Sequence, residues 1–383
     1  LVLIMVLSLS ACGGKGNDGG KESGGSAESS EAGDSDAPEI QGLTFESETE
    51  LLYAKCFRIF KYEGGYSYIE IPESGNYLVV PEGREAPEGL SKDVIVLYRP
   101  LDRIYLAATS AMALFDAVDA VGNIRLSGAD INSWYIDSAV EALRTKKMLF
   151  AGKYSEPDYE MLINEGCDLA VESTMIYHTP KVKEMIEDLG IPVLVDRASY
   201  EEHPLGRTEW VKLYAVLTGK EEEAEEFFNK QAAIIEKLKD FENTGRTVAF
   251  FYVNTDGSIV VRNPDDYIAK MIDIAGGVYA FKDLPVDQGT SINISMEEFY
   301  NTAVDADYLI YNGTIDSPLT SVDDLIKKDA LFKDFKAVKE GNVYTTGKSF
   351  YQATDTVGEM ILDMNHMLTG EETETMRFLT HME

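Results

Sequence analysis

The sequence predicts an α/β protein with two doubly wound lobes joined by one long helix, and with an extra β-hairpin region on the N-terminal side. Strand-like apolar runs alternate with helix-like periods over residues 94–207 and again over 242–383, which indicates the lobes. An amphipathic stretch at 208–241 separates them. The roughly 340 residues after residue 42 are also more than one hydrophobic core usually supports.

Residues 1–12 are typical of a secretion signal. An apolar run ends in Leu-Ser-Ala before Cys12, and this run is shorter than the roughly 20 apolar residues that span a bilayer. The segment resembles a bacterial lipobox, which implies that Cys12 is lipidated once the leader is removed; an ordinary leader with a chance cysteine is the alternative. Because neither Met nor a basic segment precedes the run, we expect the leader to begin upstream of Leu1.

Residues 13–42 are predicted to form a disordered acidic Gly/Ser tether. They show no apolar period, so they cannot bury enough surface to offset chain entropy. At about 5–6 Å × √n, a tether of this length reaches on the order of 30 Å. The predicted body then divides into an N-terminal lobe at 43–207, a connecting helix at 208–241 and a C-terminal lobe at 242–383.

Charge and composition exclude several function classes. A formal net charge of −33 disfavours nucleic acids and anionic lipids as partners, because binding to both depends on basic side chains. A solvated acidic surface explains this charge, and a cationic ligand is the alternative. Three cysteines make no disulfide framework, and pairing of Cys56 with Cys167 stays open. The four histidines lack metal-ligand spacing, which disfavours a dedicated zinc site.

The N-terminal lobe is predicted from its short apolar runs. Residues 57–81 alternate in short runs broken by Gly and Ser-Gly-Asn, which is typical of hairpins. From residue 94 the pattern changes to a mainly parallel sheet with helices on both faces. The expected strands are 94–98, 104–108, 148–151, 169–171 and 192–195, and the expected helices are 111–119, 158–165 and 181–189.

The stretch 208–241 carries the longest helical period, and Gly219 interrupts it, so we expect two helices or one bent helix there. Its second part, 220–241, would span roughly 33 Å at 1.5 Å per residue. The second lobe repeats the alternation. Its expected strands are 248–253, 259–261, 308–311 and 343–345, and its expected helices are 267–275, 295–302 and 355–368.

Three local signatures, in this order, resemble the substrate-binding lipoproteins of ABC importers. They are Pro-Asp-Tyr-Glu at 157–160 before Cys-Asp-Leu-Ala-Val at 167–171, Leu-Gly-Ile-Pro-Val at 189–193, and Leu-Thr-Gly-Lys-Glu at 217–221. More narrowly, the chain resembles the helical-linker class that serves ferric siderophores, vitamin B12 and haem, over residues 94–370. The 57–81 region departs from the pattern of that class. The segment that opens the first lobe, residues 98–106, is also longer than in that class.

The resemblance implies an extracytoplasmic binding protein, not an enzyme. It would be lipid-anchored to the outer face of the cell membrane, or periplasmic, and monomeric. It would capture an iron-siderophore, a corrinoid or haem between its lobes and deliver it to an ABC permease and ATPase. It would hold no cofactor of its own, because the solute carries the iron or cobalt. One glutamate on each lobe would dock on permease arginines, Glu160 on the first lobe and Glu297 or Glu298 on the second.

Candidate ligand residues lie where the predicted strands end, because open α/β sheets bind ligands at the carboxyl ends of their strands. The arginines would grip carboxylates or phosphates, the aromatic rings would stack on a macrocycle or chelator, and His178 would be an axial ligand to a metal. The alternatives are core packing for Trp210, a cap or ion pair for Arg207 and a simple hydrogen bond for His178. The candidates are Thr109, Ser110, Trp134, Tyr135, Tyr154, Ser173, Thr174, Tyr177, His178, Arg197, Tyr200, His203, Arg207, Trp210, Asn254, Arg262, Asn312 and Tyr351.

Two other functions stay open. A surface-anchored hydrolase would need catalytic groups, and the sequence has no G-x-S-x-G, H-E-x-x-H or P-loop motif, although Glu201, Glu202 and His203 near Asp196 suggest acid–base chemistry. A metal-ion-binding protein of the same superfamily would need several converging His and carboxylate ligands.

Overall fold

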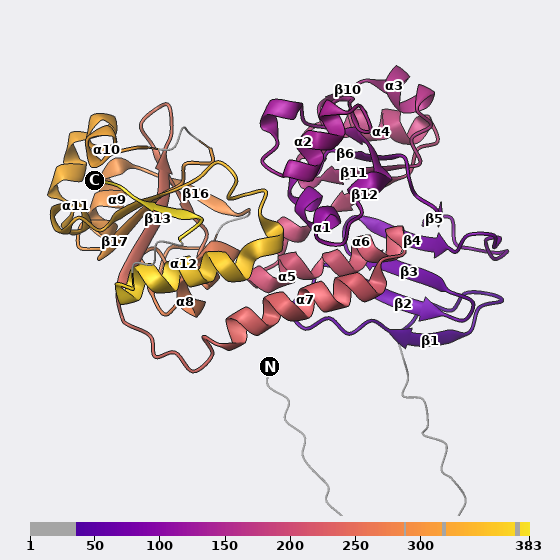
Figure 1. The fold of residues 1–383 in the computed structure, drawn as a ribbon, viewed down its shortest axis with the longest axis horizontal. Helices are drawn as coiled ribbons and strands as arrows, with labels where there is room; N and C mark the ends of the chain where they lie inside the picture. The colour runs from indigo at the N-terminus through magenta and orange to yellow at the C-terminus, as the bar shows by residue number, and fades with distance from the viewer. Residues whose placement is uncertain (1–35, 287–288, 316–318, 372–375) are drawn as a thin grey trace, which may run out of the picture. The chain divides into compact units, whose positions relative to one another are not determined.

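The computed structural model describes residues 36–286, 289–315, 319–371 and 376–383 (Figure 1). The predicted signal peptide, Cys12 and the tether up to residue 35 lie outside these residues. The end of the tether differs from expectation, because Ile40 is buried and its carbonyl accepts a hydrogen bond from the Leu43 N–H at 3.1 Å. The packed body therefore begins slightly before residue 43. Within it, Cys56 and Cys167 are free thiols, so they do not pair.

A five-stranded sheet precedes the α/β lobes, with its strands side by side in chain order. The predicted hairpins are confirmed, but the prediction that 94–98 opens the first lobe is wrong, because this strand pairs in parallel with β4. Tyr77 is buried and donates a hydrogen bond to the Val193 carbonyl at 2.9 Å, which ties this sheet to the edge of the next. The strands are β1 Phe45–Glu48, β2 Arg58–Tyr62, β3 Tyr66–Ile71, β4 Gly75–Val80 and β5 Val94–Tyr98.

The N-terminal lobe holds a parallel sheet in the order β12-β11-β6-β7-β8. Its strands are mostly buried on both faces, as expected for a parallel sheet between helices. The strands are β6 Ile104–Leu106, β7 Ile124–Ser127, β8 Leu149–Phe150, β11 Leu169–Ser173 and β12 Val193–Asp196, with a small hairpin of β9 Gly152–Lys153 and β10 Glu156–Pro157. The helices are α1 Met112–Ala117, α2 Asp137–Arg144, α3 Tyr159–Asn164 and α4 Pro180–Asp188, and the 3₁₀ turns are η1 Thr109–Ala111, η2 Val121–Asn123, η3 Ile131–Ser133, η4 Thr174–His178 and η5 Ala198–Tyr200.

Three helices, not one, connect the lobes: α5 Pro204–Glu209, α6 Val211–Thr218 and α7 Glu221–Glu236. The predicted break at Gly219 is confirmed, and this residue has φ +73°, a conformation that glycine adopts without strain. The predicted bounds 208–241 are wrong at both ends. Pro204 starts the first helix at its favoured N-terminal position, and Ile235 is the last buried side chain of α7, so no apolar stripe extends it further.

The C-terminal lobe has a mixed sheet, not a fully parallel one. Its order is β16-β14-β13-β17-β18-β19, with β15 also paired to β13, and β14, β16 and β19 are antiparallel to their neighbours. The strands are β13 Thr247–Val253, β14 Ile259–Arg262, β15 Val278–Tyr279, β16 Ser291–Ile294, β17 Tyr308–Tyr311, β18 Val343–Thr346 and β19 Leu379–His381. The helices are α8 Tyr267–Ile274, α9 Met296–Ala303, α10 Val322–Lys328, α11 Lys336–Glu340 and α12 Val357–Thr369, with 3₁₀ turns η6 Ala330–Asp334 and η7 Thr354–Thr356.

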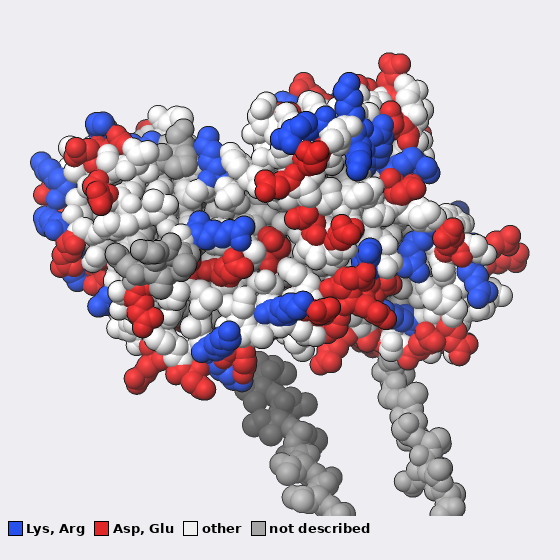
Figure 2. Space-filling model, viewed as in Figure 1, with Lys and Arg blue, Asp and Glu red and all other residues white. Residues whose placement is uncertain are grey.

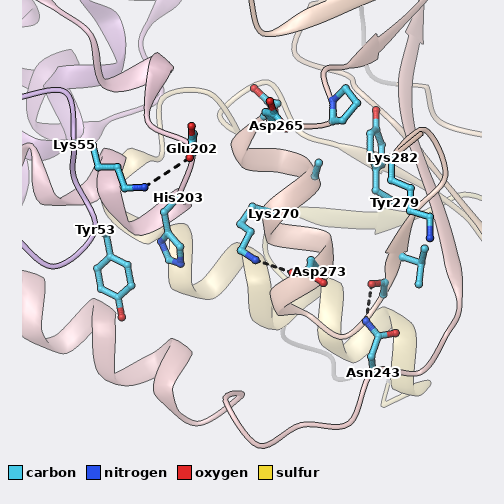
Figure 3. Close-up of a pocket in the computed structure, with 15 residues that line it drawn as sticks. Tyr53, Lys55, Glu202, His203, Asn243, Asp265, Lys270, Asp273, Tyr279 and Lys282 are labelled. Atoms are coloured by element: carbon cyan, nitrogen blue, oxygen red, sulfur yellow. Dashed lines mark hydrogen bonds and ion pairs between the residues drawn. The ribbon is translucent and has the colours of Figure 1, made fainter. Parts of the chain in front are cut away.

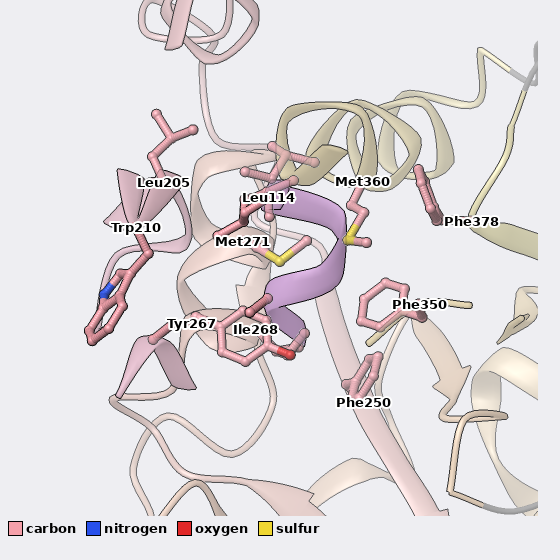
Figure 4. Packing of buried hydrophobic residues seen from close by; sticks show 14 of the residues in the cluster. Leu114, Leu205, Trp210, Phe250, Tyr267, Ile268, Met271, Phe350, Met360 and Phe378 are labelled. Carbon is pink, nitrogen blue, oxygen red and sulfur yellow. The ribbon is translucent and has the colours of Figure 1, made fainter. Parts of the chain in front are cut away.

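One hydrophobic core continues from the first lobe into the second through the connecting helices. Helix α5 packs against both α8 and α12, and Leu114, Trp210 and Met271 belong to the same buried cluster (Figure 4). The Thr208 hydroxyl donates to the Thr354 carbonyl at 2.9 Å across this junction. The base that joins the lobes is therefore packed tightly, which restricts how far they swing apart.

Candidate functional site

Most residues predicted as ligand contacts in the N-terminal lobe lie at the carboxyl ends of its parallel strands. They follow β6, end β11 or open the turns η4 and η5, as the sheet topology requires. Each is exposed or half-buried, so the structure leaves them available to a ligand. They are Thr109, Ser110, Ser173, Thr174, Tyr177, His178, Arg197 and Tyr200.

Exposed apolar side chains also gather along this edge, and the sequence analysis recognised only some of them. A contiguous exposed apolar patch marks a binding surface, whereas single exposed apolar side chains are common. The sequence does contain a pattern that predicts such residues, namely an apolar residue at the carboxyl end of an apolar strand. Phe150, the last residue of β8, is an example. The set is Ile131, Tyr135, Phe150, Met175, Tyr177 and Tyr200, and in the C-terminal lobe Ile315 lies beyond the end of β17.

In the C-terminal lobe the structure brings Asn312 and Tyr351 together. Asn312 follows β17 and donates from its amide to the Tyr351 hydroxyl at 2.7 Å. Burial raises the pKa of Tyr351 to about 12, so its phenol stays protonated and keeps a hydrogen to donate. Asn254, by contrast, bonds within its own turn, because its side chain accepts from the Thr255 N–H at 3.1 Å.

The predicted arginines Arg207 and Arg262 both lie near the ring of Tyr267. Arg207, on α5, is stacked 3.9 Å from the ring centroid, and Arg262, at the end of β14, is 5.6 Å away. Arg262 is bound by Asp266 through hydrogen bonds of 2.8 and 2.6 Å. Arg207 is 6% exposed, and within the described residues it makes no hydrogen bond or ion pair, with its Nε wholly buried. The buried Nε is closed to a ligand, so only the terminal Nη groups are left for an acceptor.

The lobes also touch through Gln352, which follows β18, and the segment after β7. The Gln352 side chain accepts from the Tyr135 N–H at 3.0 Å and donates to the Ser133 carbonyl at 2.7 Å. On the face in Figure 2 the surface is hollowed between the two lobes. A cavity of about 130 Å³ lies between them, lined by residues 199–202 of the first lobe and by Asn263, Asp265, Asp266, Val286, Gly289 and Thr290 of the second.

Both tryptophans are corrections to the predicted ligand set. Trp134 is buried and donates from its indole to the Ser127 hydroxyl at 3.0 Å, so it packs in its own lobe. Trp210 is wholly buried between the connecting helices and the first sheet, with Phe57 at 4.9 Å. A helical period shows that a side chain is buried but not whether a core or a ligand covers it. Tyr154 is half-buried in the β9–β10 turn.

Of the side chains suggested for acid–base chemistry, Glu202 is exposed and lies 3.8 Å from Lys55, and the other three serve the fold. The Glu201 carboxylate accepts from the Lys55 and Cys56 N–H groups at 2.8 and 3.0 Å and from the Trp210 indole. His203 stacks on a tyrosine, its Nδ1 accepts from a backbone N–H, and burial lowers its pKa to about 4. Asp196 hydrogen-bonds the Tyr214 hydroxyl. Among the described residues, no three His, Cys, Asp or Glu side chains form a group that would hold a metal ion.

A larger cavity, of about 690 Å³, lies beyond Glu202, Asp265 and Asp266, which also line the smaller one. Figure 3 shows Tyr53 beside His203 on one side and Lys270 of α8 on the other. Sequence reasoning missed this wall, because the N-terminal segment that carries Tyr53 and Lys55 has no periodic pattern. Its other lining residues are Asn243, Pro264, Ala269, Asp273, Gly277, Val278, Tyr279 and Lys282.

The three predicted docking glutamates lie in the first turns of helices. Glu160 is exposed at the start of α3, and Glu297 and Glu298 are exposed at the start of α9. The Ser295 side chain caps α9 by accepting from the Glu298 N–H at 3.1 Å. Their role in docking stays a prediction.

Comparison with known proteins identifies similar chains. A family model for periplasmic binding proteins matches residues 132–350. An uncharacterized lipoprotein of Methanocaldococcus jannaschii is 29% identical over 306 residues, covering 75% of this chain and 69% of the relative. A second lipoprotein of that organism is 24% identical over 332 residues, covering 83% and 82%.

Solved structures with the same fold include two proteins of Vibrio cholerae. The periplasmic haem-binding protein has a TM-score of 0.57 at 14% identity, covering 71% of this chain and 99% of that one. The vitamin B12-binding protein has a TM-score of 0.51 at 12% identity, covering 70% and 97%. A possible iron-binding solute-binding protein of Staphylococcus epidermidis has a TM-score of 0.55 at 18% identity, covering 70% of this chain and 98% of that one. At these identities the likeness concerns the fold.

Proposed function

Because the chain belongs to the periplasmic binding protein family, whose model covers more than half of its residues, we propose that it captures an iron-siderophore, a corrinoid or haem between its lobes. It is a binding protein and not an enzyme. It would hand the solute to an ABC permease and its ATPase, acting as a monomer. It would need no cofactor of its own, since iron or cobalt arrives with the solute.

The observation that carries this proposal is Arg207. A buried guanidinium without hydrogen bonds costs free energy, on the order of 1–3 kcal/mol for each unsatisfied buried group. A carboxylate or carbonyl oxygen on a bound solute would bind the terminal Nη groups of this side chain, because guanidinium binds such groups well. The exposed apolar residues at the edge of the first lobe would cover the apolar part of the same solute.

The names of related proteins support the solute class and the location. Solved structures of this fold are named for binding haem, vitamin B12 or iron, and the relatives from Methanocaldococcus jannaschii are named as lipoproteins. We therefore keep the proposal that Cys12 is lipidated and anchors the protein outside the cytoplasm. Among the described helices, none combines the length and the apolar character needed to cross a bilayer.

Docking on the permease would use Glu160 together with Glu297 or Glu298. All three side chains are exposed, and one set lies on each lobe. Carboxylates placed this way would orient the loaded protein by charge complementarity to basic side chains.

The test is a titration of the body from residue 36 onward with haemin, cyanocobalamin and a ferric-siderophore panel, followed by absorbance and by tryptophan fluorescence. We expect saturable one-to-one binding of one class. Arg207→Met should then weaken that binding by about 10- to 100-fold, because a charge-assisted hydrogen bond is lost. The control is Arg144→Met, which removes an exposed arginine of α2.

Two results would contradict the proposal. Absence of binding by all three classes, in protein shown to be folded, would overturn the solute class. Binding that Arg207→Met leaves unchanged would remove Arg207 from the ligand contacts.

A further inference from the structure

The tip of the β3–β4 hairpin reaches the edge of the candidate cleft. In this turn the Ser74 hydroxyl donates to the Val195 carbonyl, near the carboxyl end of β12, at 3.0 Å. The Tyr177 hydroxyl, on the same edge, donates to the Glu73 carbonyl at 3.2 Å. The hairpin belongs to the sheet that the sequence analysis found to be extra to the two lobes. It therefore adds a residue, Glu73, to a wall that the lobes alone would not supply.

Glu73 forms an ion pair with Arg197, one of the predicted ligand arginines. The two side chains approach to 2.8 Å, and the arginine side chain is only 14% exposed whereas the glutamate side chain is 75% exposed. Arg197 also stacks over the Tyr200 ring, 4.8 Å from its centroid. Tyr200 in turn lines the 130 Å³ cavity between the lobes. Arg197 thus lies at the cleft edge, and the Glu73 carboxylate already neutralises its charge.

Arg197 and Arg207 differ in this respect. Arg207 makes no ion pair with a carboxylate within the described residues and is stacked on Tyr267 instead. An anionic group that approaches Arg197 has to displace the Glu73 carboxylate or accept repulsion from it. The cleft edge at Arg197 therefore resists anions as long as the Glu73 carboxylate is in place.

We propose that Glu73 is a selectivity residue, which masks Arg197 so that the cleft disfavours solutes with several anionic groups. This inference rests on the proposed function, because it names the charge class of the solute. Holding the hairpin in place does not require Glu73, since Ser74, Tyr77 and the Glu73 backbone carbonyl already bond the lobe. Glu73→Gln should remove the charge and keep these contacts.

The first experiment needs no solute. We would follow the Arg197 Nε–H resonance by NMR in the isotope-labelled body while adding citrate as a polyanionic probe. In Glu73→Gln we expect a saturable shift at a citrate concentration at least threefold lower than in the parent protein. Glu70→Gln, which removes an acid of the same hairpin paired with Arg58, is the control and should match the parent. If Glu73→Gln and the parent respond alike, the masking role is overturned.

The second experiment measures selectivity with an anionic ferric tris-catecholate and a neutral ferric tris-hydroxamate. Glu73→Gln should raise the affinity for the catecholate relative to the hydroxamate by roughly three- to tenfold, whereas Glu70→Gln leaves the ratio unchanged. An unchanged ratio in Glu73→Gln contradicts the proposal. If neither complex binds the parent protein, the ferric-siderophore part of the proposed function fails, and the citrate titration alone decides the role of Glu73.

Discussion

Arg207 and Glu172 are two buried ionisable side chains without hydrogen-bond partners within the described residues. Arg207 lies on α5 against the ring of Tyr267, with its Nε wholly buried. Glu172 lies on β11 with its whole side chain buried, and neither carboxyl oxygen has a partner in the described structure. It does not line either of the cavities between the lobes. Burial raises the pKa of Glu172 to about 8, so the carboxyl is protonated in the folded protein at neutral pH.

Glu172 should make the folding stability fall as pH rises. Its pKa is raised from 4.5 to about 8, so between these values the unfolded chain is ionised while the folded protein holds a proton. The contribution is complete below pH 4.5, decreases by about 1.4 kcal/mol per pH unit at most, and is lost above pH 8. Urea unfolding at pH 5.5 and 7.5, values chosen inside this window, measures it.

Glu172→Gln should flatten this dependence, because the amide does not ionise. The exposed Glu184→Gln on α4 serves as the control and should keep the parental slope. Equal slopes in all three proteins would show that Glu172 is ionised in the folded state.

At the scale of elements, the segment before β2 depends on two carboxylates of the connecting region. The Glu209 carboxylate accepts from three successive backbone N–H groups, residues 52–54, at 2.8 to 2.9 Å. The Glu201 carboxylate accepts from the N–H groups of the following two residues, Lys55 and Cys56. Five successive N–H groups outside any sheet are thereby satisfied by α5 and the loop before it. This contact fixes Tyr53 and Lys55 as a wall of the large cavity.

The turn between α6 and α7 gives a test of backbone strain. Gly219 has φ +73°, and a Cβ there would meet only the Arg99 guanidinium at 3.5 Å, an ordinary contact. Gly219→Ala should therefore cost about 1–2 kcal/mol of unfolding free energy from the left-handed backbone alone. Gly122→Ala, in open space and without a positive φ, should cost nothing. Denaturant unfolding compares them, and equal stabilities would contradict this account of the turn.

For the whole molecule, the Gln352 amide is a contact whose loss should change the lobe arrangement. It bridges the lobes through Ser133 and Tyr135, beyond the carboxyl ends of β18 and β7. Gln352→Ala should widen the distance between lobes in the solute-free protein, and Lys348→Ala, an exposed neighbour, should not. Spin labels at exposed Lys181 and Lys327 report this distance.

The two free thiols do not compete for the label, because burial raises the pKa of each to about 12. A distance distribution in Gln352→Ala that matches the parent would show that the base alone sets the lobe arrangement.

Local patterns were sufficient to predict most elements. The strand Tyr308–Tyr311 was predicted with its observed ends, because a run of apolar residues stands between Asp307 and Asn312. The turn at Gly219 was predicted for a similar local reason. Strand β5 was assigned to the wrong sheet, since an apolar run does not show which strand it pairs with.

The site was harder to predict because its contacts join distant parts of the chain. The rule that ligands bind at the carboxyl ends of strands predicted Arg197, Asn312 and Tyr351. It did not predict Glu73, which pairs with Arg197 although it lies more than a hundred positions earlier in the sequence. The burial of Trp210 was missed for the same reason, since Phe57, just before β2, packs against it. Pairing across sheets depends on topology, which a single sequence pattern does not contain.

The core that continues through α5, α8 and α12 also bears on how the molecule comes apart. Each lobe uses the other to cover apolar side chains at the junction, so neither has a complete interior when it is produced alone. Heating should consequently melt both lobes in a single cooperative calorimetric transition, although the architecture looks divisible. A fragment cut between the lobes would expose that junction to water and aggregate.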